Sequence, residues 1–207
     1  MARRPLTNPR KQASQERSHA TVDALIEATA RLLVREGFDK ASTNRIAEEA
    51  GVSIGSLYQY YPSKEALVAA VIDHHNRELM QLVRAALAKV AALPIEAAVR
   101  KLVAAATEAH RIDPKLHRVL AEQIPRTGRL KNVDAFDREF YALFKAFLAD
   151  HSVELRAVDL ELAAFVCVTA VEALAHAAVL HRPEMASDET VGALVDEVTR
   201  LVVGYLR

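Results

Sequence analysis

The segment from Ser42 to Lys64 constrains the fold of this chain more than any other stretch of its sequence. Two short runs of helix-forming residues flank Gly51, and each follows a residue that can cap a helix: Ser42 or Thr43, then Ser53. Glycine adopts the left-handed conformation that ends many helices. Within both runs, apolar residues recur at the spacing of a helix: Ile46, Ala47, Ala50, Val52, Leu57 and Tyr61. The segment therefore predicts a helix-turn-helix, the motif whose second helix enters the DNA major groove.

The outward face of the predicted second helix carries Gly55, Tyr58 and Gln59, opposite its apolar residues. A glycine inside a helix costs about 1 kcal/mol relative to alanine, so it needs a compensating role. One explanation is close approach to a DNA backbone, and the other is a tight contact with a neighbouring helix. The spacing favours DNA and leaves both open.

The run T-N-R-I-A-E-E-A-G-V-S-I-G-S-L-Y-Q-Y-Y-P-S-K-E-A-L, preceded by Gly37 and Phe38, resembles the DNA-binding segment of the TetR family of bacterial transcriptional repressors. The resemblance extends from about Arg17 to Val71, a quarter of the chain, without a gap. It implies an all-helical homodimer with a small N-terminal DNA-binding domain and a larger C-terminal domain for ligand binding and dimerisation.

Matching the family motif position by position gives a set of expected DNA contacts. Tyr58, Tyr60 and Lys64 are expected at phosphates, with Thr43 helping at the start of the first helix. Base edges or groove fit are expected from Asn44, Ser53, Gly55 and Gln59, and Ser56 lies in the same segment. Ile54 is expected either to meet a thymine methyl group or to pack inward.

The distribution of charge along the sequence supports a DNA-binding site in the N-terminal part of the chain. The chain is neutral overall, which by itself argues against a nucleic-acid binder. Residues 1–64, however, carry ten Lys and Arg against seven Asp and Glu, a net charge of +3; residues 65–207 carry 17 against 20, a net charge of −3. Such an asymmetry concentrates attraction for phosphate on the motif. Residues 1–16 are predicted to be a flexible basic arm, either in the minor groove or simply solvated.

Composition favours a helical, soluble protein. Of the 207 residues, 51% are hydrophobic, enough for a sizeable core, and glycine and proline are scarce. The single cysteine, Cys167, excludes an internal disulfide and suits a reducing cytoplasm. The most apolar stretch, Leu160 to Leu180, is interrupted by charged or polar side chains, which argues against a membrane span. We expect a cytoplasmic protein without a membrane partner.

The periodicity predicts an all-α fold of about nine helices. Besides the two short helices of the motif, helices are expected over about 17–36, 63–92, 95–111, 114–124, 132–150, 157–181 and 188–206. The predicted domains are a DNA-binding domain, residues 17–62, and a ligand-binding and dimerisation domain, residues 63–207. The long helix that starts after Ser63 joins the two.

An effector site is hypothesised in the C-terminal domain. Phe136, Phe140, Phe144 and Phe147 share one helix face, which indicates either core packing or the apolar wall of a ligand pocket. Glu172 and His176 lie one turn apart on an apolar helix and need polar partners if buried. Structural pairing, ligand binding and dimer contacts all explain them. Glu122 poses the same question, and its alternative is a solvated helix face.

No enzyme or metal motif accompanies these residues. His74 and His75 are adjacent and point apart on a helix, so the eight histidines predict no metal site and no cofactor. Cys167 is predicted to be a small core residue. The sequence contains no nucleophile elbow or phosphate-binding glycine loop, and we expect no enzymatic activity.

The two C-terminal helices are expected to form a homodimer. Residues 157–181 and 188–206 are strongly apolar, and pairing them with a second copy would make a four-helix bundle; Val195 and Val198 are expected at that interface. The predicted function is a DNA-binding transcriptional regulator, a repressor released from a palindromic operator by a small lipophilic effector. The alternative is an all-helical ligand carrier or enzyme with a vestigial DNA-binding head.

Overall fold

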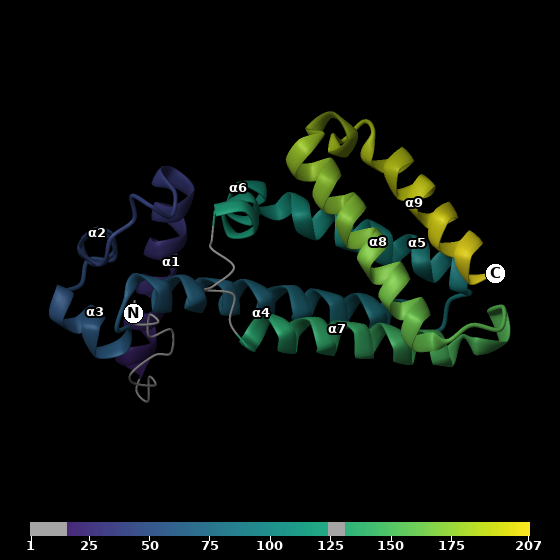
Figure 1. Cartoon of the computed structure of the whole chain (residues 1–207), viewed down its shortest axis with the longest axis horizontal. Helices are drawn as coiled ribbons and strands as arrows, with labels where there is room; N and C mark the ends of the chain where they lie inside the picture. The colour runs from purple at the N-terminus through teal and green to yellow at the C-terminus, as the bar shows by residue number, and fades with distance from the viewer. Residues whose placement is uncertain (1–15, 124–130) are drawn as a thin grey trace, which may run out of the picture. The chain divides into compact units, whose positions relative to one another are not determined.

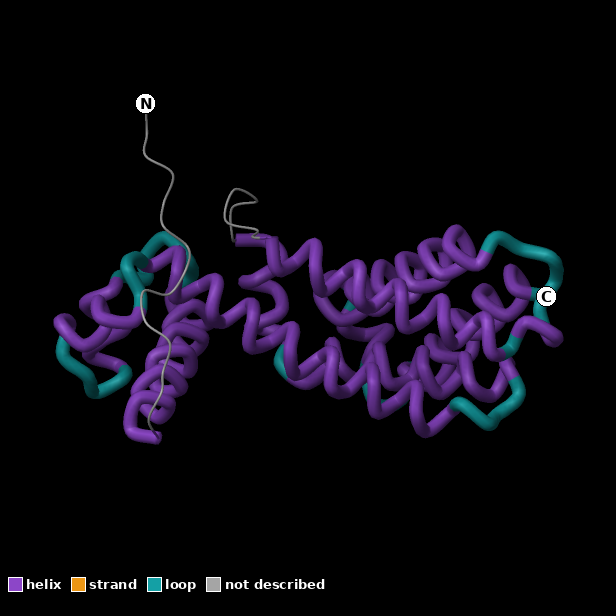
Figure 2. Tube along the Cα trace, turned by 90° about the horizontal axis from the view of Figure 1, so that it is seen from below, coloured by secondary structure: helices purple, strands orange, loops and turns teal. Residues whose placement is uncertain are grey.

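The structure, a computed structural model, describes residues 16–123 and 131–207, and these residues form helices and connecting loops without a strand (Figures 1 and 2). The predicted basic arm lies, apart from its last residue, outside the described residues. The α-helices are α1 (Glu16–Glu36), α2 (Thr43–Glu49), α3 (Ile54–Tyr60), α4 (Lys64–Val90), α5 (Ile95–Ile112), α6 (Pro114–Arg118), α7 (Lys131–Asp150), α8 (Leu160–His181) and α9 (Val191–Leu206). The all-α prediction is confirmed.

Three predicted helices differ from the structure in type or by three residues at one end: those expected over 114–124, 157–181 and 188–206. The helix expected over 114–124 is α6 followed by a turn of π-helix, η1 (Val119–Gln123). Helix α8 begins at Leu160 rather than 157, because the Asp159 carboxylate accepts backbone N–H groups from the first turn, 2.8 and 3.0 Å away. Short 3₁₀ helices precede α8 and α9: η3 (Ser152–Glu154) and η4 (Pro183–Ala186).

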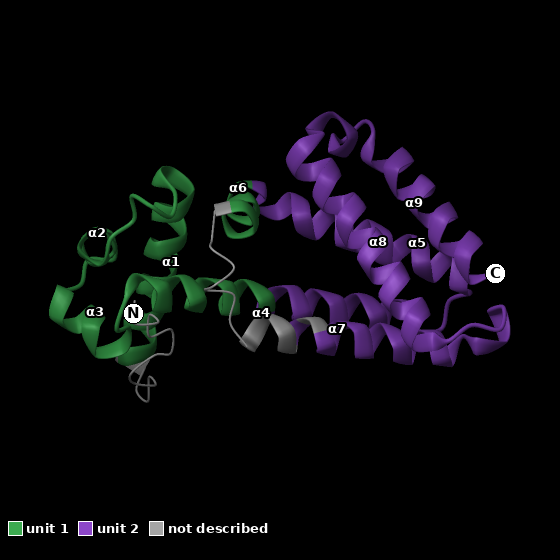
Figure 3. Ribbon diagram, viewed as in Figure 1, with its two compact units in different colours: residues 1–76, 115–133 green, residues 77–114, 134–207 purple. Residues whose placement is uncertain are grey.

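The chain divides into two compact units, coloured separately in Figure 3. The first unit contains residues 1–76 and 115–133, and the second contains residues 77–114 and 134–207. Helix α4 therefore contributes its first half to one unit and its second half to the other. The division proposed from the sequence, at residues 62 and 63, follows the DNA-binding motif instead and stays a prediction.

The first unit packs α1, α2, α3 and the start of α4 around one apolar core. Residues from η1 join that core, so the segment after α5 belongs structurally with the N-terminal helices. Fully buried leucine and isoleucine side chains dominate it: Leu25, Leu32, Leu33, Ile46, Leu57 and Leu67. Burying each such side chain contributes about 1.5–3 kcal/mol, so the short helices are held by packing rather than by their own propensity.

The second unit is built on α5, which packs against both α8 and α9. The second half of α4 runs beside α7 (Figure 1), and Arg84 of α4 pairs with Glu139 of α7. The shared core takes buried residues from each of these five helices: Val90, Ile95, Val99, Val103, Phe147, Leu148, Ala163, Ala164, Cys167, Val195, Val198, Val202 and Leu206. This packing gives the second unit a core of its own.

Within the described residues, helix α8 has the length and apolar composition of a membrane span, with 39% of its most apolar window buried in the protein. Core helices of soluble proteins share these properties. Ala163, Ala164 and Cys167 on its inner face are buried against the rest of the second unit. This packing accounts for the apolar composition of that face.

Candidate DNA-binding and effector sites

The helix-turn-helix is fixed by the caps that the sequence predicted. Ser42 caps α2, where its Oγ accepts the backbone N–H of Arg45, and Ser53 caps α3, where its Oγ accepts the N–H of Ser56 at 3.1 Å. Between the two helices, Gly51 has φ of +68°, in the left-handed region. These local features set where α2 ends and where α3 begins, and they orient the outward face of α3.

That outward face is open, as predicted. Tyr58 is 42% exposed, and Gly55 and Gln59 are also exposed, whereas Leu57 is fully buried on the opposite side. A Cβ added to Gly55 would meet Ser53 Oγ at 3.8 Å, an ordinary contact, and no neighbouring helix of the described chain within 4 Å. The tight helix contact considered for Gly55 is therefore wrong. Close approach by an external partner is the explanation that stands.

The other side chains expected to contact DNA differ in how far they are exposed and in the partners that they already have. Tyr58 Oη and Thr43 Oγ1 are 3.0 Å apart, so they share a hydrogen bond across α2 and α3. Lys64 Nζ donates to the Phe38 carbonyl at 2.8 Å and lies 4.1 Å from the centre of its ring. Tyr60 is only 8% exposed. The expected phosphate contacts of these side chains stay predictions.

The remaining expected DNA contacts sit at the starts of the two short helices. Asn44 and Ser53 are exposed, Ser56 is partly buried, and Ile54 is 38% exposed, which favours an outward role over inward packing. Ser53 and Ser56 also share a hydrogen bond between their hydroxyls at 2.9 Å. Direct base contacts by these residues stay predictions.

An ion-pair network that no pattern in the sequence predicts braces α1 against α2. Glu49 of α2 accepts hydrogen bonds from Arg35 at 2.9 Å and Arg31 at 3.3 Å, both on α1, and Arg45 of α2 pairs with Glu36 of α1. The bonds from Arg35 and Arg31 lower the pKa of the Glu49 carboxyl below its ordinary value. Several charges acting together hold a geometry better than an isolated surface pair.

The aromatic stripe on α7 divides into a core half and a more open half. Phe147 is buried, and Phe144 packs beside it with ring centroids 5.5 Å apart, so this pair is part of the core of the second unit. Phe136 and Phe140 stack at 6.2 Å with nearly parallel rings and are partly exposed. Both interpretations of the stripe therefore find support, each in a different half.

The polar partner of Glu172 is a histidine on another helix, which the sequence does not predict. Oε2 of Glu172 lies 3.5 Å from Nε2 of His110, which is on α5. The Glu172 side chain is 50% exposed, whereas the His110 side chain is 6% exposed, so the pair lies at the edge of the second core rather than inside it. Burial lowers the pKa of His110, but the hydrogen bond to Glu172 and its charge outweigh burial and raise it.

The other residues singled out lie as follows. Cys167 is buried in the second core, and burial raises the pKa of its thiol to about 11, which suits a packing role. Glu122 belongs to the first unit and is exposed there. Its role in ligand binding stays a prediction.

The expected position of two interface residues is wrong. Val195 and Val198 are each 5% exposed and lie in the core of their own chain, because α9 turns that face toward α5. The exposed apolar side chains on α8 and α9 are instead Leu162, Phe165, Leu174 and Leu201, between 39% and 56% exposed. Large apolar side chains left in water mark the face that a partner would cover.

Comparison with known proteins identifies the family. The family described as "Tetracyclin repressor-like, C-terminal domain" matches residues 94–206, more than half of the chain. The chain belongs to the TetR family. The N-terminal model of that family, "Bacterial regulatory proteins, tetR family", matches residues 25–71, which include α2 and α3. The predicted family is confirmed.

This TetR-family chain is similar to one curated relative and to two solved structures. It is 29% identical over 116 residues to the nucleoid occlusion factor SlmA of Haemophilus ducreyi. The aligned region covers 56% of this chain and about half (55%) of that relative. The fatty acid degradation regulator FadR from Bacillus halodurans has a TM-score of 0.71 at 21% identity, covering 95% of this chain and 99% of that one. FadR from Bacillus subtilis, solved with stearoyl-CoA, has a TM-score of 0.69 at 15% identity, covering 89% and 99%. These structures show a shared fold.

Proposed function

We propose that this TetR-family protein is a DNA-binding transcriptional regulator, a repressor that leaves a palindromic operator when a small lipophilic effector binds its second unit. It acts in the cytoplasm as a homodimer. Binding of effector and of operator are coupled reciprocally through α4, which contributes residues to both units.

The observation that carries DNA binding is the open outward face of α3. Gly55, Tyr58 and Gln59 are exposed on a helix whose opposite side is buried, and caps at both ends of the turn fix its orientation. Among the described residues, only Ser53 Oγ would lie within 4 Å of a Cβ atom at Gly55. A bare helical backbone beside aromatic and amide side chains suits close approach to a groove and its phosphates.

A lipophilic effector is supported by the second unit. Phe140 is a partly exposed aromatic side chain stacked on Phe136, and Phe144 continues this face into the core. Pockets for small molecules are mostly apolar with a few polar groups, and Glu172 and His176 supply such groups from α8. FadR of Bacillus subtilis, which shares the fold, binds stearoyl-CoA. Phe140 and Phe144 are proposed to line the site.

The homodimer is supported by the exposed apolar residues of α8 and α9. Leu162 and Phe165 lie one turn apart on α8, and Leu201 is exposed on α9. Covering them with the same surface of a second copy removes them from water and produces the two-fold symmetry that a palindromic operator requires.

Two experiments test this function. Duplexes that bind the protein are first selected from a random pool, and the affinity for the enriched duplex is then measured at several salt concentrations. The expected result is an enriched palindrome whose affinity falls steeply with salt. A matched pair of variants separates the units: Gln59→Ala should relax base preference, whereas Gln81→Ala, an exposed glutamine on α4, should leave it unchanged. Equal affinity for all duplexes would contradict the proposal.

A second experiment tests effector binding on the purified complex of the protein with its operator. Long-chain acyl-CoA and the matching free fatty acid are titrated into it, and Phe144→Ala is compared with the parent protein. Release by either lipid, weakened in the variant while operator affinity is kept, supports the proposed site. Equal loss of thermal stability and DNA binding with the effector response preserved would assign Phe144 to the core alone.

A further inference from the structure

One face of helix α8 is exposed over about three turns within the second unit. Its side chains recur at intervals of three and four residues, the spacing of one helix face: Leu162, Phe165, Thr169 and Glu172. Leu162 is 56% exposed and Phe165 is 53% exposed, whereas Ala164 and Cys167 on the opposite side are buried in the core. We call this row of four exposed side chains the α8 stripe, and it combines apolar with polar groups.

The polar groups of the α8 stripe up to Thr169 have partners in their own chain. Oγ1 of Thr169 lies 3.3 Å from Oη of Tyr141, on α7, and the Tyr141 ring lies 5.9 Å from that of Phe165. Glu161, which precedes the stripe, accepts a hydrogen bond from Nζ of Lys145 at 2.6 Å. Polar groups that are already paired cost less free energy to remove from water than unpaired ones.

Glu172, at the far end of the α8 stripe, has a partner whose charge depends on pH. Nδ1 of His110, on α5, lies 2.8 Å from the carbonyl oxygen of Ala106. A carbonyl group only accepts hydrogen bonds, so Nδ1 carries a proton. Nε2 faces the Glu172 carboxylate at 3.5 Å. Only the doubly protonated, positively charged ring therefore neutralises that carboxylate, and a neutral ring turns a lone pair toward it.

We propose that a second copy of the chain covers the α8 stripe, and that this dimer is tight only while the His110 ring is positively charged. The dimer is that of the proposed function, on which this proposal rests. In a two-fold dimer the same surface faces itself, so each copy meets the charges that it also carries. Such a face pairs best when its charges cancel, and the charge of Glu172 is cancelled by charged His110.

A neutral His110 leaves one uncompensated carboxylate per copy at this interface. Glu172 is 50% exposed in the single chain, so contact with the partner removes water from it, and burying an unpaired charge is costly. Leu162 and Phe165 stay covered, so the dimer is weakened rather than abolished. Glu172 is also proposed to meet the polar end of the effector, so effector and proton act on the same carboxylate at the end of the stripe.

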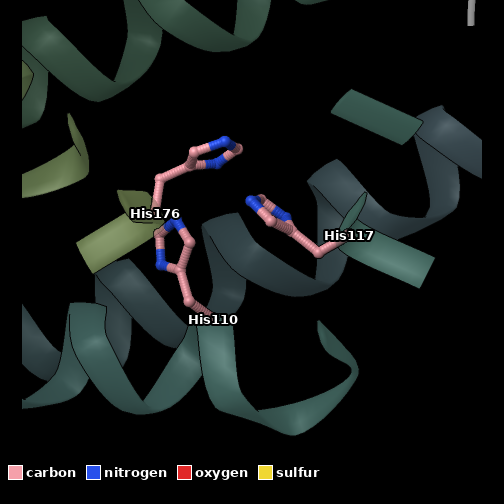
Figure 4. A group of neighbouring side chains, drawn as sticks. All are labelled: His110, His117 and His176. Atoms are coloured by element: carbon pink, nitrogen blue, oxygen red, sulfur yellow. The ribbon is translucent and has the colours of Figure 1, made fainter. Parts of the chain in front are cut away.

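Two further histidines on α8 lie near this pair. The ring of His176 is 6.4 Å from that of His110 and 5.8 Å from that of His181. Figure 4 shows the rings of His110 and His176 side by side; His117, drawn with them, belongs to the first unit. His176 lies one turn from Glu172, so a proton on His176 also adds positive charge near that carboxylate. Acidification therefore acts in the same direction through either histidine.

The other charges beside His110 leave histidine as the group that responds between about pH 6 and 9. Arg111 pairs with Glu108 at 2.7 Å and with Asp188, and carboxylates and guanidinium groups ordinarily keep their charge in this range. Burial lowers the pKa of His110, but the bond to Glu172 and its charge outweigh burial and raise it. The contribution of the charged ring is therefore complete below pH about 6.5 and is lost as pH rises through the pKa of the folded state.

Sedimentation equilibrium of the full-length protein from pH 6 to 9, without added lipid, tests the proposal. The dissociation constant of the parent dimer should rise at least ~10-fold over this range, the equivalent of one pKa unit. Glu172→Gln keeps the shape of the side chain without its charge, so its dissociation constant should change little. The matched control Glu139→Gln, which removes a carboxylate paired with Arg84 of α4, should follow the parent. His176→Gln should still weaken as pH rises, because His110 remains.

A parent dimer with the same dissociation constant at every pH, or a Glu172→Gln variant with the parent's pH dependence, would overturn the role of the pair. A flat profile for His176→Gln would do the same, because it would assign the response to His176. A folded Phe165→Glu variant that stays dimeric would place the interface away from the stripe. A parent that is monomeric at every pH would reject the homodimer as well, whereas a pH-dependent dimer without any selected operator would keep this inference and reject the proposed function.

Discussion

The two units of this protein bury similar cores but leave very different surfaces in water. The first exposes a short polar and aromatic face on α3, centred on Tyr58, and fixes it with caps and ion pairs. The second exposes apolar side chains on α8 and α9 and pairs Glu172 with the buried His110. The first unit therefore presents a polar face held in place by local contacts, whereas the second leaves apolar side chains exposed, for which we propose a partner subunit and an effector.

The largest expected effect is on dimerisation through the second unit. Replacing Phe165 and Leu201 together with glutamate would bury unpaired charges at the proposed interface. Burying such charges costs about 3–5 kcal/mol, and weakens the dimer at least ~100-fold. Analytical ultracentrifugation at micromolar concentration should then find a folded monomer.

The matched control for this pair is Val153→Glu, which places the same charge on a side chain that is 95% exposed in η3. It should leave the sedimentation coefficient unchanged. A double variant that sediments as the parent does, or a control that dissociates equally, would place the interface elsewhere.

Gly55→Ala should separate stability from DNA binding in the first unit. Space around Gly55 admits a methyl group, so helix propensity should stabilise the fold by up to about 1 kcal/mol. At a close contact with DNA the same methyl group should cost about 1–3 kcal/mol, roughly 5- to 150-fold in affinity. Thermal unfolding and operator titration measure the two effects.

Gly192→Ala is the control, because it adds a methyl group to an equally open helical position of the second unit. It should change stability without changing operator affinity. If Gly55→Ala binds operator as the parent does, the bare backbone of α3 has no role at the groove.

The first unit could be predicted in detail because its signals are local. Ser42, Ser53 and Gly51 act within one helical turn of themselves, so their positions in sequence give the helix boundaries directly. The predicted start of α8, residue 157, is three residues early because the apolar periodicity does not locate the cap that the Asp159 side chain provides.

In the second unit, the features that matter depend on contacts between distant segments. Neither the approach of His110 to Glu172 nor the burial of Val195 against α5 follows from periodicity, since both depend on how helices pack. A histidine in the last turn of α5 was the only available signal, and it became meaningful once α8 was placed beside it.

A smaller effect is expected from Lys64→Ala in the first unit. If Lys64 reaches a phosphate, its loss should weaken all duplexes alike and reduce the salt slope by about 0.9 per subunit. Its bond to the Phe38 carbonyl is also lost, so stability should fall as well. Lys145→Ala, which removes an exposed lysine of α7, should keep the parent's salt slope. A Lys64 variant with lower stability and an unchanged slope would assign Lys64 to bracing alone.

The smallest expected effect is the pH dependence of stability that comes from His110. Burial opposes its charge, but Glu172 raises its pKa above the ordinary value of about 6.5. The resulting stability is therefore complete below pH about 6.5 and is lost as pH rises through the pKa of the folded state. Urea unfolding across pH 5 to 8 measures it, and Glu172→Gln should flatten the curve. A parent curve as flat as the variant's would contradict the pairing.

The most direct test of the account is the affinity of the parent protein for its selected duplex, measured with Gly55→Ala and with the Phe165 and Leu201 double variant. The account predicts tight, salt-dependent binding by the parent and loss in both variants, through the contact in the first and through the dimer in the second. Parent protein that binds selected and scrambled duplexes equally, with both variants unaffected, would contradict it and favour a ligand carrier with a vestigial DNA-binding head.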